Sequence, residues 1–376
     1  MEEAMKKLAL TFLTTSLLSS LLASTTVLAC TDIKLTAKDG TIMIGRTMEF
    51  EMDLKSNLVS TPREKLITNT TPDGKPGLSW KGKYGYVFLD ALNTGYGTDG
   101  MNEMGLSIED LYLPGETQYQ AIPIGKEKSA VSYLRFTDWV LGNFQTTDEV
   151  RAALPKIYVY AQTVSGMGSM IFPLHFAIHD ATGKSIVVEF VGGKMNVYDH
   201  VTNVMTNVPQ YPWQVTNLRN YLNLSPYNPE PIVANGVTYT ATGQGSGATG
   251  LPGDYSPPSR FVKMAFLLKN AMPVNNAQEA VVLATHIINN VDIPIGAIRS
   301  KQTNGQDEAG DFTQWTVFKD LTHKVLYYHT YANPTLQSIS LSKIDFSPNA
   351  PQLKMSIASA PIIADVTNQF LMQKSS

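Results

Sequence analysis

The feature that most constrains the fold of this chain is its single cysteine, Cys30, which directly follows a segment that resembles an export signal. Met5-Lys6-Lys7 gives this segment a positively charged start, and residues 8–29 carry no charge. An exported chain with one cysteine cannot form an internal disulfide. We therefore expect the mature fold to be held together by packing alone.

Val27 and Ala29 fit the small-residue positions of a signal peptidase site. The sequence therefore predicts a signal peptide over residues 1–29, a single domain over residues 30–376, and a periplasmic or secreted protein. The apolar stretch is short and has no stop-transfer flank, so we expect no membrane association after its removal. Val-Leu-Ala-Cys also resembles a bacterial lipobox, which would leave Cys30 lipidated, although Leu28 occupies a position usually held by a small residue.

Cleavage after Ala29 would give one residue both a thiol and a free α-amino group. A thiol attacks as its thiolate and needs a proton acceptor within hydrogen-bond reach. The pKa of an N-terminal amine, about 7.7–8.0, is close to the thiol pKa of about 8.5, so proton transfer between them is nearly balanced. Cys30 is therefore a candidate nucleophile that supplies its own base.

Composition and motifs exclude several classes of function. Lys and Arg total 29 against 32 Asp and Glu, without long runs of one charge, which argues against a nucleic-acid surface. The histidines lack paired spacing and the chain has no second cysteine, so we expect no metal. No phosphate-binding glycine loop opens a helix, so we expect no cofactor. A small-molecule partner is the remaining expectation.

The order of predicted elements is strands, helices, strands, a long loop, helices and strands, which is typical of an α+β fold with antiparallel sheets. Lys38-Asp39-Gly40 predicts a hairpin turn between strands over 32–37 and 41–46. The other expected strands cover 84–92, 106–113, 175–179, 185–190, 197–199, 203–206, 237–240, 314–319, 325–331 and 338–344. Helices are expected over 129–141, from 147 to before Pro155, and over 213–222, 259–272 and 277–290, and a turn-rich connection is expected over 98–105.

Arg46 ends the partner strand of the first hairpin, where its guanidinium would favour a Cys30 thiolate. Several blocks of the sequence, including the one that contains Arg46, resemble the choloylglycine hydrolase family, which contains bile salt hydrolases and penicillin V acylases. The blocks run in order over nearly the whole mature chain: Cys30-Thr31, Gly45-Arg46-Thr47-Met48, Asp99 to Leu106, Met205-Thr206-Asn207, Gly243-Gln244-Gly245, Gly250 to Asp254 and Ser259-Arg260-Phe261.

The resemblance implies an N-terminal-nucleophile (Ntn) hydrolase with a four-layer αββα sandwich, in which antiparallel sheets lie between helix layers. It implies hydrolysis of a non-peptide carboxamide through an acyl-enzyme on Cys30. Arg46 and Arg260 would be active-site arginines, and Asn207 would donate to the oxyanion, a role worth about 2.7–4 kcal/mol in comparable sites. From the residues alone, the favoured interpretations are a turn at Asn207 and a helix start at Arg260.

Two positions separate members of the family or depart from its usual pattern. Glu49 stands where the family usually has an Asp that contacts the nucleophile, so its longer side chain must shift the carboxylate or the backbone. Tyr112 stands where bile salt hydrolases typically have Asn and penicillin V acylases Tyr. An aromatic face here favours an aryloxyacyl or fatty-acyl amide over a bile salt. Conjugated bile salts and N-acyl homoserine lactones remain alternatives.

The Pro- and Gly-rich loop over residues 220–250 resembles the assembly loop of the family and predicts a homotetramer. A hypothesis of another class is a lipid-anchored binding protein with the fold but no catalysis. A papain-like protease would need a histidine partner for Cys30, and no candidate lies in a recognisable motif. The candidates are His175, His179, His200, His286, His323 and His329.

Overall fold

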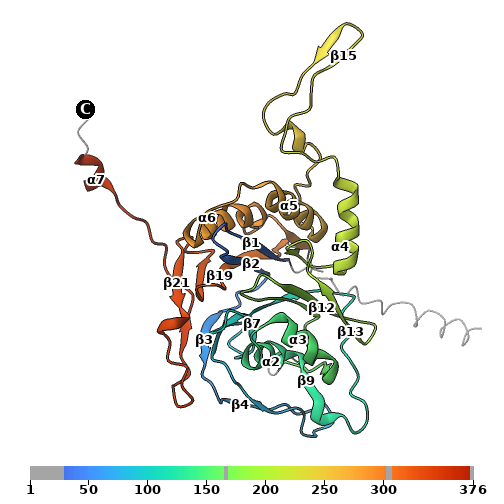
Figure 1. Ribbon diagram of the computed structural model, residues 1–376, viewed down its shortest axis with the longest axis vertical. Helices are drawn as coiled ribbons and strands as arrows, with labels where there is room; N and C mark the ends of the chain where they lie inside the picture. The colour runs from blue at the N-terminus through green and yellow to red at the C-terminus, as the bar shows by residue number, and fades with distance from the viewer. Residues whose placement is uncertain (1–28, 165–167, 302–306, 373–376) are drawn as a thin grey trace, which may run out of the picture.

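The computed structural model describes residues 29–164, 168–301 and 307–372 (Figure 1). Of the predicted signal peptide, only Ala29 falls within these ranges. Two stacked antiparallel sheets form the centre of the domain, and the nucleophile strand lies in the smaller one.

The first sheet has six strands in the order β14-β1-β2-β19-β20-β21. Cys30 begins β1 and pairs with Met48 of β2, and Asp32 pairs with Arg46. The predicted hairpin is confirmed, with Gly40 in the left-handed turn conformation at φ +90°. The strands are β14 (Val204–Met205), β1 (Cys30–Thr36), β2 (Ile42–Phe50), β19 (Phe312–Asp320), β20 (Val325–Thr330) and β21 (Gln337–Ser340).

The second sheet has eight strands in the order β13-β12-β11-β8-β7-β6-β3-β22, and every pair in it is antiparallel. These strands are β13 (Lys194–Asp199), β12 (Ser185–Val191), β11 (Leu174–His179), β8 (Ser107–Tyr112), β7 (Gly97–Asn102), β6 (Tyr86–Asp90), β3 (Asn57–Thr61) and β22 (Lys354–Ser356). Short two-stranded pairs are formed by β4 (Leu66–Ile67) with β5 (Trp80–Lys81), β9 (Ala130–Ser132) with β10 (Tyr158–Tyr160), and β17 (Arg299–Lys301) with β18 (Asp307–Ala309).

Helices cover the outer face of each sheet. α5 (Pro257–Asn270) and α6 (Ala277–Ile288) pack on the first sheet, and α2 (Phe136–Asn143) packs on β7 and β8 of the second. Figure 1 shows this layering, with α3 (Thr147–Ala153) beside α2. The arrangement confirms the expected α+β fold and its four αββα layers.

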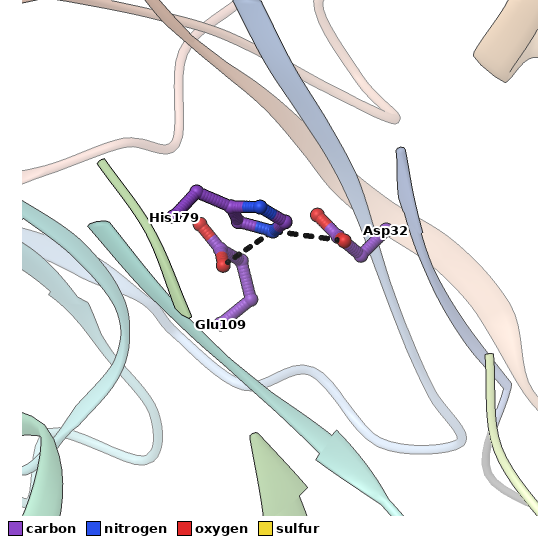
Figure 2. Close-up of side chains that lie close together, drawn as sticks. All are labelled: Asp32, Glu109 and His179. Atoms are coloured by element: carbon purple, nitrogen blue, oxygen red, sulfur yellow. Dashed lines mark hydrogen bonds and ion pairs between the residues drawn. The ribbon is translucent and has the colours of Figure 1, made fainter. Parts of the chain in front are cut away.

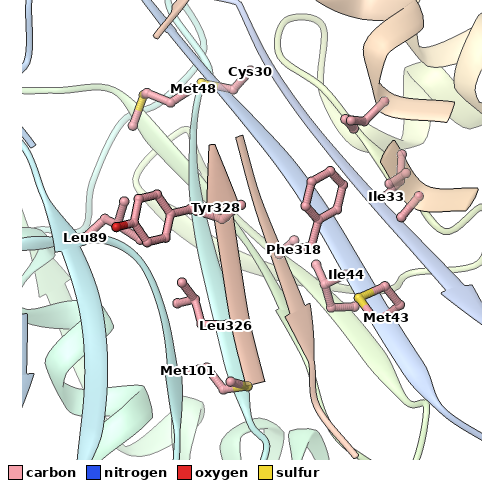
Figure 3. Packing of buried hydrophobic residues seen from close by; sticks show 14 of the residues in the cluster. Cys30, Ile33, Met43, Ile44, Met48, Leu89, Met101, Phe318, Leu326 and Tyr328 are labelled. Carbon is pink, nitrogen blue, oxygen red and sulfur yellow. The ribbon is translucent and has the colours of Figure 1, made fainter. Parts of the chain in front are cut away.

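Apolar side chains fill the spaces between the layers. One buried cluster includes Ile33 and Phe318 from the first sheet together with Leu89 and Met101 from the second (Figure 3). A separate cluster joins the second sheet to α2 and contains Phe136, Phe176 and Phe190. Because burial of apolar area is the main stabilising contribution, this packing accounts for a fold without a disulfide.

The prediction of a turn-rich connection over 98–105 is wrong, because residues 97–102 form β7 in the middle of the second sheet. Its glycines make this strand possible by leaving room for α2. A Cβ on Gly100 would lie 2.7 Å from Leu141 Cδ1, and one on Gly97 would lie 2.8 Å from Thr137 Cγ2. Glycine here indicates close helix packing rather than a turn.

The helix expected over 129–141 begins later, at Phe136, because residues 130–132 form β9 in a parallel pair with β10. The next helix is capped by Thr146, whose Oγ1 accepts from the Glu149 N–H, and not by Thr147. The strands β3 and β22 were not expected from the sequence.

The long loop contains two strands where the sequence predicts one: β15 (Ile232–Ala234) and β16 (Val237–Tyr239) form a hairpin that projects from the body (Figure 1). It follows α4 (Tyr211–Asn217), and the chain ends in an extended arm with α7 (Thr367–Leu371). Within the described ranges, no helix has both the length and the apolar character needed to cross a bilayer.

The turn between β7 and β8 gives a direct test of this packing. Gly105 has φ +85°, and a Cβ there would overlap the Leu321 carbonyl oxygen, whereas Gly115 at φ +78° has nothing within 4 Å of its Cβ position. We expect Gly115→Ala to lower the free energy of unfolding by about 1 kcal/mol and Gly105→Ala by about 2–4 kcal/mol, because strain and overlap add. Urea denaturation measures both, and equal losses would contradict the contact with Leu321.

Candidate active site

The Cys30 side chain lies at the start of β1, almost completely buried, and lines a cavity of about 60 Å³ between the two sheets. The other lining residues are Arg46, Met48, Glu49, Phe50, Leu54, Ala91, Leu92, Thr98, Asp110, Tyr112, Phe172 and Leu174. A second cavity of about 50 Å³ shares part of this wall, including Leu92 and Phe172. The thiol therefore faces a narrow, mainly apolar space.

Arg46 lies beside the thiol, as the hairpin predicts. Its Nη2 is 3.6 Å from Cys30 Sγ and donates to the Asp110 carbonyl oxygen at 2.8 Å. The guanidinium carbon lies 4.7 Å from the centre of the Trp315 ring, a cation–π contact. Among the described residues, Arg46 Nε and Nη1 have no hydrogen-bond partner. This buried cation therefore retains donors for another group.

Arg260, on α5, holds the main chain around the nucleophile. Its Nη1 donates to the Cys30 carbonyl oxygen at 2.6 Å and to Thr31 Oγ1 at 2.5 Å. Its Nη2 donates to Asn207 Oδ1 at 2.7 Å. The guanidinium is buried, and its contacts connect the start of β1 to the segment that follows β14. Arg260 thus fixes the position of the nucleophile instead of touching the thiol.

Asn207 joins three parts of the site. Its Oδ1 accepts from the Cys30 backbone nitrogen at 2.7 Å, and its Nδ2 donates to the Tyr112 carbonyl oxygen at 2.8 Å. Because the two neighbours of Oδ1 are donors and the neighbour of Nδ2 is an acceptor, the side-chain amide can have only this orientation. One of the two amide N–H groups is therefore engaged, and the other remains for the expected oxyanion contact.

Glu49 does not take the position expected for the family carboxylate. Its Oε1 accepts from Thr313 Oγ1 at 2.7 Å, and the Cys30 nitrogen has Asn207 as its partner. Burial raises the pKa of the Glu49 carboxyl to about 7, against the opposing effect of Arg260. The longer side chain thus places its carboxylate against β19, where it acts on the thiol through its charge.

The thiol has competing electrostatic influences. Burial raises the pKa of Cys30, and the Glu49 carboxylate adds to this effect. Arg46, the Glu49 backbone N–H and Arg260 act in the opposite direction. The two arginines therefore partly offset the cost of a buried thiolate.

The residue before the nucleophile is enclosed in the same site. Ala29 is buried. Burial raises the pKa of Asp311 to about 7, and the Ala29 backbone acts in the opposite direction. Removal of Ala29 would leave a free amine on Cys30 beside Asn207.

Tyr112 forms an aromatic wall of the cavity. Its ring packs edge-on against Phe50 at 6.4 Å and Phe172 at 5.8 Å between ring centres. Its carbonyl oxygen also receives the Asn207 hydrogen bond. The structure thus brings together all six residues singled out from the sequence: Cys30, Arg46, Glu49, Tyr112, Asn207 and Arg260.

Sequence reasoning missed Asp110, Thr313 and Trp315, which surround Arg46 and Glu49. The Asp110 carbonyl oxygen accepts from Arg46, and Thr313 reaches Glu49 because the two residues are paired between β19 and β2. The sequence carries no local signal for either contact. No histidine lies among the residues that line the Cys30 cavity. This absence in the described site argues against a papain-like pair.

The charges around the thiol predict opposite effects of two neutral substitutions. Arg46→Gln should raise the pKa of Cys30, and Glu49→Gln should lower it, because the first removes a cation and the second an anion. The pH dependence of iodoacetamide alkylation measures this pKa, with Met48→Leu as an uncharged neighbouring control. A shift of the same sign in both variants would show that their charges do not control the thiol.

The chain was compared with known proteins. The family described as linear amide C–N hydrolases, choloylglycine hydrolase family, matches residues 30–356. A bile salt hydrolase/transferase from Clostridium perfringens is 35% identical over 325 residues, which cover 85% of this chain and 94% of the relative. A penicillin V acylase from Pectobacterium atrosepticum is 27% identical, covering 91% and 89% of the two chains.

A crystal structure of a variant of the conjugated bile acid hydrolase from Clostridium perfringens superposes with a TM-score of 0.79 at 31% identity. The match covers 90% of this chain and all of that structure. The sequence and the fold both match this family. The chain belongs to the choloylglycine hydrolase family and is a hydrolase of linear amide C–N bonds.

Proposed function

We propose that Cys30 is the nucleophile of this hydrolase and that its own α-amine, freed by removal of residues 1–29, is the base. The observation that carries the proposal is the position of Cys30. Its thiol lines the cavity beside Arg46, and its nitrogen lies 2.7 Å from Asn207 Oδ1. One residue thus presents both reacting groups to the same small space.

In the proposed reaction, the thiol proton passes to the amine and the thiolate sulfur attacks the amide carbonyl carbon. The C–N bond breaks as the amine returns that proton to the leaving nitrogen, which gives a thioester. Water then attacks the thioester, releasing the acid and restoring the thiol. The second Asn207 N–H is the candidate donor to the oxyanion, and Arg260 holds Asn207 in place.

We propose a conjugated bile salt as the substrate. The support is the similarity to the bile salt hydrolase/transferase and the conjugated bile acid hydrolase, which exceeds the similarity to the penicillin V acylase. The mainly apolar lining of the cavity suits an apolar acyl group. This proposal differs from the preference for aryloxyacyl amides that Tyr112 suggested in the sequence.

An aryloxyacyl amide such as penicillin V is the second candidate, and Tyr112 is the observation that favours it. The wall formed with Phe50 and Phe172 offers ring faces and edges to an aromatic acyl group. Acyl homoserine lactones and a lipid-anchored, non-catalytic protein remain as outcomes of the experiments below.

We further propose export of the protein and its assembly into a homotetramer through the β15–β16 hairpin. The hairpin projects from the domain (Figure 1), and its apolar side chains are open to solvent. Ile232 is 66% exposed and Val233 70%. Exposed apolar residues on a projecting hairpin favour docking on another copy of the chain.

Mass spectrometry of the protein purified from its producing cells tests export and assembly together. The denatured mass should correspond to a chain that begins at unmodified Cys30, and the native mass should equal four such chains. A lipid adduct on Cys30, or an N-terminus elsewhere, would rule out the proposed base. A monomer would rule out assembly through the hairpin and leave the catalytic proposal intact.

Hydrolysis of glycocholate, penicillin V and an acyl homoserine lactone tests the chemistry and the substrate. We expect the highest kcat/KM with glycocholate, and a loss of roughly 10⁴-fold or more in Cys30→Ala with unchanged melting temperature. Met43→Leu, in the buried core and not among the residues that line the cavity, is the matched control and should retain activity. Higher kcat/KM with penicillin V, reduced further in Tyr112→Ala than in Tyr112→Phe, would favour the second candidate. Hydrolysis by Cys30→Ala would refute the nucleophile.

A further inference from the structure

A second group of functional side chains lies between the two sheets, two residues beyond the nucleophile. Asp32 belongs to β1 of the first sheet, and Glu109 and His179 belong to the neighbouring strands β8 and β11 of the second. Figure 2 shows the His179 ring nitrogen pointing at both carboxylates. One donor atom from each residue lies within 4.8 Å of the others, and all three side chains are fully buried.

The unused atoms of this group point inward. Among the described residues, Asp32 Oδ1 and Glu109 Oε2 have no hydrogen-bond partner. His200, also fully buried, has no hydrogen-bond partner on either ring nitrogen, and its Nε2 lies 3.8 Å from Asp32 Oδ2. Buried polar groups are rarely left without partners, so these orphaned atoms require an explanation.

The opposite side of each side chain is anchored. His179 Nδ1 is 2.7 Å from Ser185 Oγ. Glu109 Oε1 accepts from Lys319 Nζ at 2.6 Å and from Ser107 Oγ at 2.8 Å. The His200 ring stacks on Tyr211 with 5.4 Å between ring centres. These contacts hold His179 Nε2 and Glu109 Oε2 toward a common point.

Several charged groups are buried together at this place. Asp32, Glu109 and Asp99 are carboxylates, and Lys319 is the fully buried ammonium that contacts two of them. A divalent cation would provide a partner for the carboxylate oxygens that have none among the described residues.

We propose that Asp32, Glu109 and His179 bind a divalent transition metal ion of the zinc type. His179 Nε2 lies 3.1 Å from Asp32 Oδ2 and 3.4 Å from Glu109 Oε2. Two ligands bound at 2.0–2.1 Å in a tetrahedron are about 3.4 Å apart, so these separations fit one ion. An imidazole and two carboxylates are suitable zinc ligands.

The three protein ligands are fully buried and hold the ion away from solvent, so the ion has a structural role. It joins β1 to β8 and β11, and thereby fixes the first strand against the second sheet directly behind Cys30. Loss of the ion would weaken the contact between the sheets and loosen the position of the thiol.

The test is the metal content of the full-length protein. Because the site is buried, the ion must enter during folding, so the protein is produced in medium supplemented with zinc and analysed by inductively coupled plasma mass spectrometry. We expect about one zinc per chain, and about one cobalt with visible d–d absorption after production in cobalt medium. Less than about one tenth of an equivalent of either metal in well-folded protein would overturn the proposal.

Variants locate the ion. Asp32→Asn and His179→Gln should lower the zinc content to below about one tenth of an equivalent and lower the melting temperature. His323→Gln is the matched control, because His323 also pairs with a carboxylate, Asp320, but its side chain is exposed. Zinc retained in folded Asp32→Asn and His179→Gln would refute the site.

Cys30→Ala separates this site from the catalytic thiol, which is itself a potential zinc ligand. We expect the zinc content of Cys30→Ala to equal that of the wild type. Loss of zinc in this variant would show that the thiol binds the metal and would overturn the proposal. Neither result depends on which amide the enzyme hydrolyses.

Discussion

The pairing of β1 with β2 is the constraint on which the site depends. Its register puts Cys30 opposite Met48 and Asp32 opposite Arg46, in a strand pair that is buried on both sides. Because side chains alternate along a strand, the thiol, the carboxylate and the guanidinium share the face that meets the second sheet. A slip of β1 by one residue would turn the thiol and the Asp32 carboxylate away from that sheet and from Arg46.

Burial of these charged groups is energetically unfavourable, and hydrogen bonds to them offset part of the unfavourable free energy. Arg260 alone joins Cys30, Thr31 and Asn207. These bonds hold the nucleophile before any substrate arrives, which is the preorganisation that catalysis requires. Arg46 differs, because part of its guanidinium has no partner among the described residues and remains for the thiolate or a substrate.

The same strand connects the catalytic site with the proposed metal site. Asp32 follows Cys30 by two residues, and its carboxylate meets Glu109 and His179 across the interface between the sheets. A rigid link at this point would limit movement of the thiol relative to the cavity. The sheets otherwise meet mainly through apolar contacts, which resist separation but specify position less strictly.

The sequence by itself determined the α+β class and the first hairpin, because alternation and turn chemistry are written in consecutive positions. The resemblance to the family singled out Glu49, Tyr112, Asn207 and Arg260, which lie around Cys30 and Arg46 in the structure. The prediction from the sequence was wrong at β7, because glycines that allow close helix packing also occur in turns. It was also wrong at the start of α2. Only the tertiary structure decided that Glu49 faces Thr313 and that Asp32, Glu109, His179 and His200 converge. Residues so distant in the chain meet through strand order and sheet stacking, which no local spacing encodes.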